Sequence, residues 1–192
     1  MRTWEIARKT KETDIDLFIS LDGGETEVDT GIGFFDHMLT ALAVHAGLSL
    51  SVSCKGDLHV DCHHTIEDVG IVLGDALCKA LGDKSGIVRY GSFYIPMDEA
   101  LGFASIDISG RPYFVFHADF TADRMGEMDT QMVEEFFRAV AFHAGITLHL
   151  SVPYGTNDHH KAEALFKAFA HALKAAAALN ADGSVLSTKG VL

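Results

Sequence analysis

The amino-acid sequence predicts an α+β fold in which two halves of the chain repeat one order of strands and helices. The segment DCHHTIEDVGIVLGDALCKAL aligns with NDHHKAEALFKAFAHALKAAA, which begins about half a chain length further on in the 192-residue sequence. Residues 39–53 also resemble residues 136–151, and residues 13–24 are weakly similar to residues 101–110. Three matches in the same order indicate an internal duplication.

Local periodicity predicts the elements of each half as β-β-α-β-α. Alternating apolar and polar residues predict strands, and apolar residues three and four apart predict helices. The predicted strands are 15–21, 48–53, 92–95, 103–108, 113–117 and 147–152, of which 92–95 and 113–117 are extra candidates in the second half. The predicted helices are 34–45, 63–81, 130–143 and 159–178, with Gly47, Gly82 and Gly145 as terminators.

The two halves are predicted to form a single domain over residues 1–192. One half alone is too small to bury a comfortable core, and only the turn GDKSG at 82–86 separates the two. The repeats are placed at about residues 1–84 and 85–180, with their helical faces packed together. Residues 181–192 then form a C-terminal tail.

Composition narrows the class of protein. The chain is 48% hydrophobic and 22% charged, which is typical of a globular protein with a packed core. A formal net charge of -12 argues against a nucleic-acid partner, because binding phosphates needs clustered Lys and Arg.

No apolar run approaches the roughly 18 residues that span a bilayer. With three cysteines, no CxxC and no signal peptide, we expect a reduced, cytoplasmic protein.

The histidine pairs at the start of the duplicated helices are the main chemical signal. His63 and His64 precede Glu67, so either histidine can share a helix face with the glutamate, but adjacent side chains cannot share one target. His159, His160 and Glu163 repeat the pattern. Imidazole and carboxylate suit Mn, Fe, Ni or Zn. We therefore predict two metal sites, in which the His and Glu of one helix face the remaining His of the other.

Further ligands are expected on the preceding helices. His37, in GFFDHML, aligns with Glu135, in VEEFFR, although a solvated helix charge is an equally good interpretation of Glu135. His45 and His143 both precede a helix-ending Ala-Gly, where a histidine interacts with the helix dipole. That interpretation is favoured for His143, whereas His45 is kept as a candidate substrate contact.

At these residues the sequence resembles the imidazoleglycerol-phosphate dehydratases of histidine biosynthesis, nearly from end to end. One departure is that the family often has a glutamine after HML, where this chain has Ala41 in HMLTAL. The resembling segments are RKTKETD (8–14), GFFDHML (33–39), DCHHTIED (61–68), MDEAL (97–101), DISGRPY (107–113), VEEFFR (133–138), NDHHKAE (157–163) and STKGVL (187–192).

The resemblance implies a lyase that dehydrates imidazoleglycerol phosphate to imidazole acetol phosphate and water. It implies four helices between two four-stranded mixed sheets, and a homo-oligomer of twenty-four subunits with active sites at subunit contacts. Two Mn²⁺ ions per active site are implied as cofactors. Their implied ligands are His37, His63, His64, Glu67, Glu135, His159, His160 and Glu163.

The resemblance also implies the contacts to a small-molecule phosphate substrate. Glu12, in KETD, matches a substrate-contacting glutamate and is the candidate general acid or base; Glu67 and Glu163 are further catalytic candidates. The C-terminal tail is expected to close on the phosphate. The predicted substrate-binding residues are Glu12, His37, His45, Arg89, Asp98, Arg111, Ser187 and Lys189.

Two other functions use the same residue types. A dinuclear metallohydrolase acting on phosphate esters is the alternative enzyme, but such sites usually rely on Asp-rich ligands, and the HHxxE pattern that the two halves share has no Asp. A protein that only stores or senses metal is the second alternative, and it would not need Arg89, Arg111 or Lys189.

Overall fold

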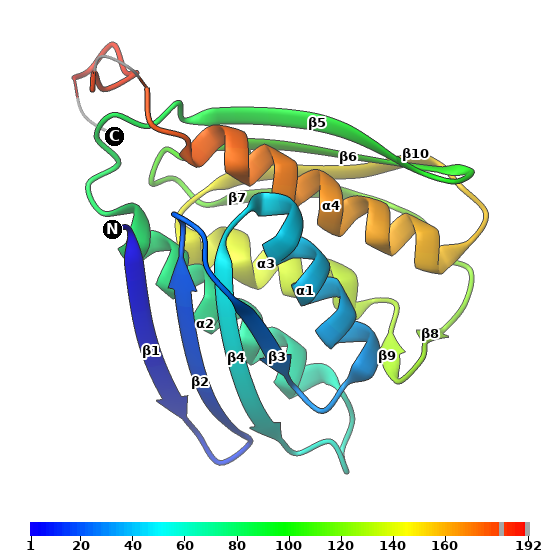
Figure 1. Ribbon diagram of the computed structural model, residues 1–192. Helices are drawn as coiled ribbons and strands as arrows, with labels where there is room; N and C mark the ends of the chain where they lie inside the picture. The colour runs from blue at the N-terminus through cyan, green and yellow to red at the C-terminus, as the bar shows by residue number, and fades with distance from the viewer. Residues whose placement is uncertain (181–182, 191–192) are drawn as a thin grey trace.

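The computed structural model describes residues 1–180 and 183–190, and it contains two sheets with four helices between them (Figure 1). The first sheet holds β1 (Thr3–Lys9), β2 (Thr13–Ser20), β3 (Thr26–Asp29) and β4 (Ser49–Gly56). The second holds β5 (Tyr90–Met97), β6 (Ala100–Asp107), β7 (Tyr113–His117) and β10 (Thr147–Tyr154). The helices are α1 (Gly33–Ala46), α2 (His63–Leu81), α3 (Met132–Ala144) and α4 (Asp158–Ala177).

The two sheets have the same topology, which confirms the predicted fold class. The strand order is β1-β2-β4-β3 in one and β5-β6-β10-β7 in the other. In each sheet the long strands pair antiparallel and the last strand pairs parallel to its neighbour, so both sheets are mixed. A small hairpin, β8 (Arg124–Met125) and β9 (Met128–Asp129), lies between β7 and α3.

The helices form the middle layer, and their contacts cross between the two halves. α2 lies on β1 and β2 and packs against α3, while α4 lies on β5 and β6 and packs against α1 (Figure 1). Phe35 of α1, Phe136 and Phe137 of α3 and Phe166 of α4 are fully buried in one core. Since their rings contact one another across three helices, the two halves share a single hydrophobic core.

The close packing of α2 against α3 requires small residues on α2. A Cβ on Gly70 would lie 2.9 Å from the Phe136 carbonyl oxygen, and one on Gly74 would lie 2.9 Å from the Val140 carbonyl oxygen. These distances are shorter than real Cβ contacts, so a side chain at either position would push α2 away from α3.

The structure differs from the predicted β-β-α-β-α half: each half has three strands of its four-stranded sheet before its first helix, and the second half adds the β8–β9 hairpin. β1 and β3 were not predicted, because β1 is an edge strand with little burial and β3 is only four residues long. The four helices lie within about two residues of their predicted bounds. Gly47 and Gly145 end their helices in the left-handed region, with φ of 69° and 66°.

The predicted C-terminal tail, 181–192, is described only over residues 183–190, and residues 181–182 and 191–192 lie outside the described part. The division into repeats at about residues 84 and 85 stays a prediction. Within residues 1–180 and 183–190, no helix is both long enough and apolar enough to cross a membrane.

Candidate metal centre

Three predicted ligands from the two halves come together between α1 and α4. His37 of α1 and His159 of α4 both point at Glu163, with Nε2 atoms 3.8 Å and 3.2 Å from its Oε2. One ligand atom from each of these residues lies within 4.8 Å of the others. The two imidazoles are exposed, whereas the carboxylate is buried.

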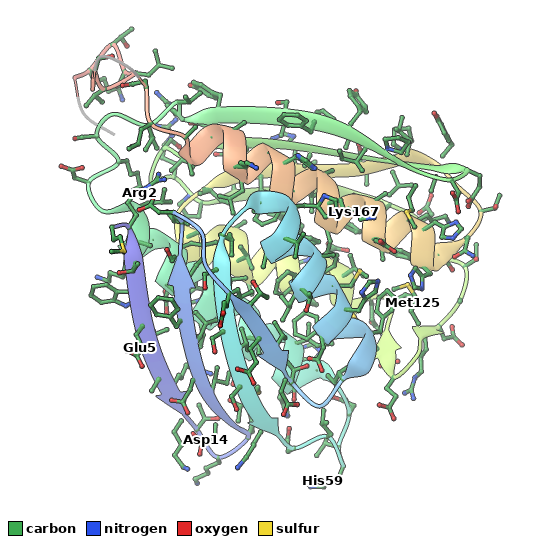
Figure 2. All side chains as sticks on the ribbon, in the orientation of Figure 1. Arg2, Glu5, Asp14, His59, Met125 and Lys167 are labelled. Carbon is green, nitrogen blue, oxygen red and sulfur yellow. The ribbon has the colours of Figure 1, made fainter. Side chains whose placement is uncertain are left out.

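Lys167 is a residue of this site that the sequence reasoning missed. It projects from α4 one turn beyond Glu163, and its Nζ lies 2.6 Å from Glu163 Oε1 (Figure 2). Burial raises the pKa of Glu163, but the hydrogen bond and charge of Lys167 outweigh burial and lower the pKa. The carboxylate is therefore held ionised, as a metal ligand must be. The only sequence signal was spacing, since His159, Glu163 and Lys167 follow one another at intervals of four.

The duplicated helix α2 carries the corresponding residues, although among the described residues only His37, His159 and Glu163 bring their ligand atoms within 4.8 Å of one another. His63 Nε2 lies 3.6 Å from Glu67 Oε2, again four residues apart, which repeats the pair of His159 and Glu163. Glu135 of α3 lines one small pocket of about 190 Å³ with Glu67. Glu135 lies on the helix that packs against α2, as His37 lies on the helix that packs against α4, and its role as a ligand stays a prediction. It also contacts Arg138 at 3.7 Å, so its charge is partly balanced.

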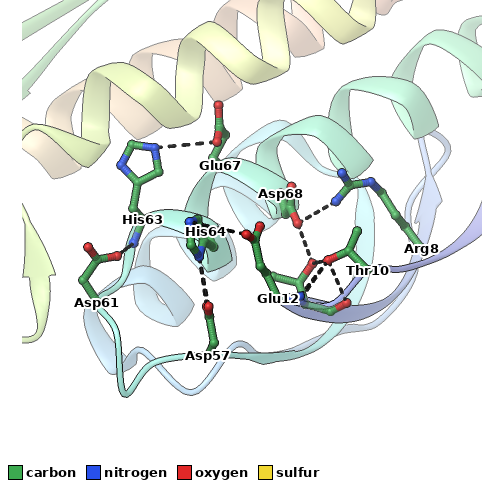
Figure 3. A network of polar contacts seen from close by, with 10 residues as sticks. Arg8, Thr10, Glu12, Asp57, Asp61, His63, His64, Glu67 and Asp68 are labelled. Atoms are coloured by element: carbon green, nitrogen blue, oxygen red, sulfur yellow. Dashed lines mark hydrogen bonds and ion pairs between the residues drawn. The ribbon is translucent and has the colours of Figure 1, made fainter.

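The second histidine of each pair points elsewhere. His64 Nδ1 lies 3.0 Å from Asp57 Oδ2 (Figure 3), and its ring stands at 81° to the ring of His63. His160 Nδ1 lies 2.7 Å from Glu99 Oε2. Hydrogen bonding to these carboxylates raises the pKa of both histidines.

Within one chain the His and Glu of one duplicated helix do not meet the remaining His of the other, so that predicted combination stays a prediction for contacts between chains. Among the described residues, the three-residue group contains neither His64 nor His160. The two halves do combine, but through His37 instead. The reason is local: consecutive residues of a helix point about 100° apart, so the second histidine leaves the face that its neighbour shares with the glutamate.

Local structure fixes both pairs at the first turn of a helix. The Asn157 side chain caps α4 by accepting a hydrogen bond from the His160 amide at 3.2 Å. Asp61 Oδ1 accepts from the His63 amide at 2.7 Å at the start of α2. Asn and Asp favour such positions because their side chains satisfy amides that the helix leaves unpaired.

The donor set fits divalent transition metals. The group of His37, His159 and Glu163 and the corresponding residues at α2 offer imidazole nitrogen and carboxylate oxygen, the ligand types that Mn, Fe or Zn accept. His64 and His160 each give Nδ1 to a carboxylate, which leaves Nε2 available, and a metal-bound histidine usually has such a partner on its other nitrogen. The residues present therefore fit a metal site.

Two acidic residues on hairpin turns face these second histidines. Glu12, between β1 and β2, has Oε1 3.9 Å from His64 Nε2. Asp98, between β5 and β6, has Oδ2 3.6 Å from His160 Nε2. Both carboxylates are exposed, and the two predicted substrate contacts thus occupy equivalent places in the two halves.

The two helix-ending histidines have different partners. His143 Nδ1 lies 3.0 Å from Asp75 Oδ1, at the last turn of α3. His45 Nδ1 lies 3.2 Å from His171 Nε2, and burial, Lys167 and His171 lower the pKa of His45. His45 lies about two turns after His37 on α1, and its contact with a substrate stays a prediction.

The four predicted phosphate contacts meet in one cavity of about 850 Å³. Arg89, Arg111, Ser187 and Lys189 all line it. Arg89 is held in place, because its Nε and Nη2 donate to the two Asp107 oxygens at 2.7 Å and 3.1 Å and its Nη1 donates to the Leu186 carbonyl at 2.6 Å. Arg111 is exposed, and its Nη2 lies 3.5 Å from Asp107 Oδ2.

This cavity and the three-residue group lie at opposite ends of α4. The Arg89 amide donates to the Ala176 carbonyl at the last turn of the helix, whereas His159 is in the first turn (Figure 1). A helix of 20 residues is about 30 Å long. One small substrate cannot reach both places in a single chain.

A family model described as imidazoleglycerol-phosphate dehydratase matches residues 30–173 of this chain. The chain belongs to the imidazoleglycerol-phosphate dehydratase family. The imidazoleglycerol-phosphate dehydratase of Streptococcus sanguinis (strain SK36) is 57% identical over 194 aligned positions, which cover 100% of both proteins. That of Acetivibrio thermocellus is 56% identical and covers 100% of this chain and 99% of the relative.

Solved structures of this family have the same fold. The imidazoleglycerol-phosphate dehydratase of Staphylococcus aureus matches with a TM-score of 0.84 and 44% identity over 93% of this chain and 98% of that one. The enzyme from Pyrococcus furiosus, solved in complex with (S)-C348, matches with a TM-score of 0.82 and 37% identity over 97% of this chain and 100% of that one. The chain is accordingly a hydro-lyase, and the comparisons do not favour a metallohydrolase.

The family departure at Ala41 lies on α1, between His37 and His45. Ala41 is half-buried on α1, four residues after His37 and four before His45, so the three share a helix face. A glutamine there would place an amide between the two histidines, and this chain has only a methyl group.

Proposed function

We propose that this chain performs the metal-dependent dehydration of imidazoleglycerol phosphate to imidazole acetol phosphate and water in L-histidine biosynthesis. The observation that carries the proposal is the duplicated arrangement of His37, His159 and Glu163 on one side and Glu135, His63 and Glu67 on the other. Two equivalent groups suit two metal ions, and we take these to be Mn²⁺, two per active site.

The metal would be held by these six residues together with His64 and His160. When bound, it would supply positive charge that favours the ionised form of the substrate imidazole, because a cation depresses the pKa of its ligands. Glu67 and Glu163 are ligands in this scheme, and their additional catalytic role stays a prediction. Asp57 and Glu99 orient the imidazoles of His64 and His160.

Glu12 is the residue that we assign to proton transfer. The reaction removes a proton from a carbon that is not beside a carbonyl, and it must also protonate a departing hydroxyl. Glu12 is exposed, lies 3.9 Å from His64 and is not part of either three-residue group, so its carboxylate is available to a substrate. Asp98 occupies the matching place beside His160 and is assigned to substrate contact.

We propose that the active site forms between subunits. The cavity lined by Arg89 and Lys189 lies about one length of α4 from the group of His37, His159 and Glu163. Among the described residues, neither His64 nor His160 belongs to that group. A homo-oligomer brings one chain's cavity to another chain's metal group. The family resemblance suggests twenty-four subunits.

A cytoplasmic location also stays a prediction, in keeping with the three free cysteines.

The first test compares the wild type with the double variant His64→Ala/His160→Ala. We expect about two Mn²⁺ per wild-type chain, and formation of imidazole acetol phosphate only when metal is bound. The double variant should retain fewer metals and make no ketone, because each lost imidazole removes one ligand from one of the two ions. Metal analysis and a ketone assay give both readings. Release of inorganic phosphate without ketone would support the metallohydrolase, and metal binding without any reaction would support the storage protein.

The phosphate cavity gives a separate prediction. Arg111→Ala should raise the Michaelis constant by at least about tenfold, because a charged hydrogen bond contributes about 1.5–3 kcal/mol. Arg111 is exposed and only loosely paired with Asp107 at 3.5 Å, so folding should not change. Lys55→Ala removes an exposed cation outside the cavity and serves as control. Equal Michaelis constants for the two variants would remove Arg111 from substrate binding.

A further inference from the structure

Asp68 is a buried carboxylate that neither metal group uses. It follows Glu67 on α2, is only 7% exposed, and lies four residues after His64 on the same face of the helix. Its Oδ2 accepts a hydrogen bond from Thr13 Oγ1 and lies 2.6 Å from Arg8 Nη1 (Figure 3). Both partners flank the β1–β2 turn, so Asp68 ties this turn to the helix that carries His64.

The turn that Asp68 holds is the one that carries Glu12. Thr10 Oγ1 accepts from the Glu12 amide at 3.1 Å and from the Thr13 amide at 3.0 Å, and the Thr10 amide donates to the Thr13 carbonyl at 2.8 Å. Thr13 is 3% exposed. The turn is therefore internally rigid, and its orientation on α2 is set by the side chain of Thr13.

A second link joins the same turn to His64. The Glu12 carbonyl accepts from the Asp57 amide at 3.0 Å, and the Asp57 side chain is bound to His64 Nδ1. Glu12 is thus fixed through its own backbone on one side and through Thr13 and Asp68 on the other. Only its side chain remains free to swing, with Oε1 3.9 Å from His64 Nε2.

The other half of the chain shows that the fold does not require this anchor. The residue at the position of Asp68 in the repeat is Ala164, which packs on Gly102 of β6. A Cβ on Gly102 would lie 2.6 Å from the Ala164 carbonyl carbon, so here the strand and helix meet through close backbone contact. The carboxylate anchor occurs in the half that presents Glu12, and the other half keeps its hairpin in place without one.

We infer that Asp68, through Thr13, is a positioning residue that fixes the Glu12 turn against His64. This inference rests on the proposed role of Glu12 in proton transfer. Asp68 touches neither metal nor substrate. It acts by restricting the turn to one position, which limits the unproductive conformations that the Glu12 carboxylate can adopt.

Thr13→Val tests the inference with little change of shape. Valine keeps the branched side chain and the backbone hydrogen bonds, but it cannot donate to Asp68. Hydrogen–deuterium exchange should become at least about tenfold faster over residues 8–16, with α2 unchanged. Turnover should fall about tenfold with metal content intact, because a displaced catalytic group costs rate more than binding. Thr13→Ser, which keeps the hydroxyl, should behave as the wild type in both measurements.

The same substitution in a Glu12→Gln background separates positioning from general damage. If Thr13 acts through Glu12, Thr13→Val should lower turnover about tenfold in the wild type and not at all in Glu12→Gln. Equal losses in both backgrounds would overturn the inference, and so would unchanged exchange over residues 8–16. Asp68→Asn, which weakens the pair with Arg8, should accelerate the same exchange.

The exchange measurement also distinguishes this inference from the proposed function. If Glu12→Gln turned over substrate normally, Glu12 would have no part in proton transfer, and the positioning role would fail with it. Faster exchange in Thr13→Val, restored in Thr13→Ser, would then show that Asp68 anchors the turn for structure alone. If the wild type made no ketone, the dehydratase proposal would fail. The exchange result would still decide whether Asp68 holds the Glu12 turn on α2.

Discussion

Replacing Asp158 by alanine is expected to lower the free energy of unfolding by about 3–5 kcal/mol. Asp158 and Lys161 form a buried pair, 8% and 5% exposed, with Lys161 Nζ 2.8 Å from Asp158 Oδ1. Asp158 Oδ2 also accepts from the Thr121 and Ala122 amides at 2.8 Å and 2.6 Å. Alanine would leave a buried ammonium without its partner carboxylate and two loop amides without an acceptor.

The ionisation of Asp158 agrees with this expectation. Burial raises the pKa of its carboxyl, but the hydrogen bonds from Lys161, Ala122 and Thr121 outweigh burial and hold the pKa at about 2. The carboxylate is therefore charged at neutral pH and bound on both oxygens. Removing this carboxylate should therefore lower the free energy of unfolding by more than the loss of a surface ion pair, which contributes about 0–1 kcal/mol.

Urea unfolding at neutral pH measures the change in the free energy of unfolding. A chelator and equal protein concentrations remove any contribution from metal binding. Asp14→Ala is the matched control, because Asp14 pairs with Lys9 on the exposed face of the first sheet. We expect the control to change the free energy of unfolding by less than about 1 kcal/mol. If the two variants were equally stable, the buried pair would have no special role.

Glu163→Gln is expected to remove one of two Mn²⁺ ions and to lower turnover by more than about a hundredfold. The amide keeps the size of the carboxylate, but it lacks the negative charge that Glu163 would contribute to the metal site beside His37 and His159. Losing an outer partner of a metal ligand already costs about 10–100-fold, and Glu163 is proposed as a ligand itself.

Metal analysis after dialysis against Mn²⁺ gives the first reading, and turnover gives the second. Glu67→Gln should remove the other ion, because Glu67 holds the equivalent place on α2. Glu134→Gln is the control: this carboxylate pairs with Arg138 on α3 and belongs to neither group. Two ions retained in Glu163→Gln would show that the three residues do not bind metal.

Much of the fold followed from patterns that lie within a few residues of one another. The helix α2 begins and ends where its histidine pair and Gly82 predicted, because helix formation depends on local spacing and caps. The strand β3 was missed, because its four residues are held by parallel pairing with β4, more than 20 positions away in the sequence.

The sequence by itself determined the duplication, the helices and the kinds of ligand, because repeats, periodicity and residue types are all local properties. Only the tertiary structure decided which histidine joins each glutamate, that Lys167 belongs beside Glu163, and that Asp68 holds the turn of Glu12. It also placed the phosphate cavity at the far end of α4 from His159. These are contacts between distant segments, and their geometry is set by how the helices and sheets pack.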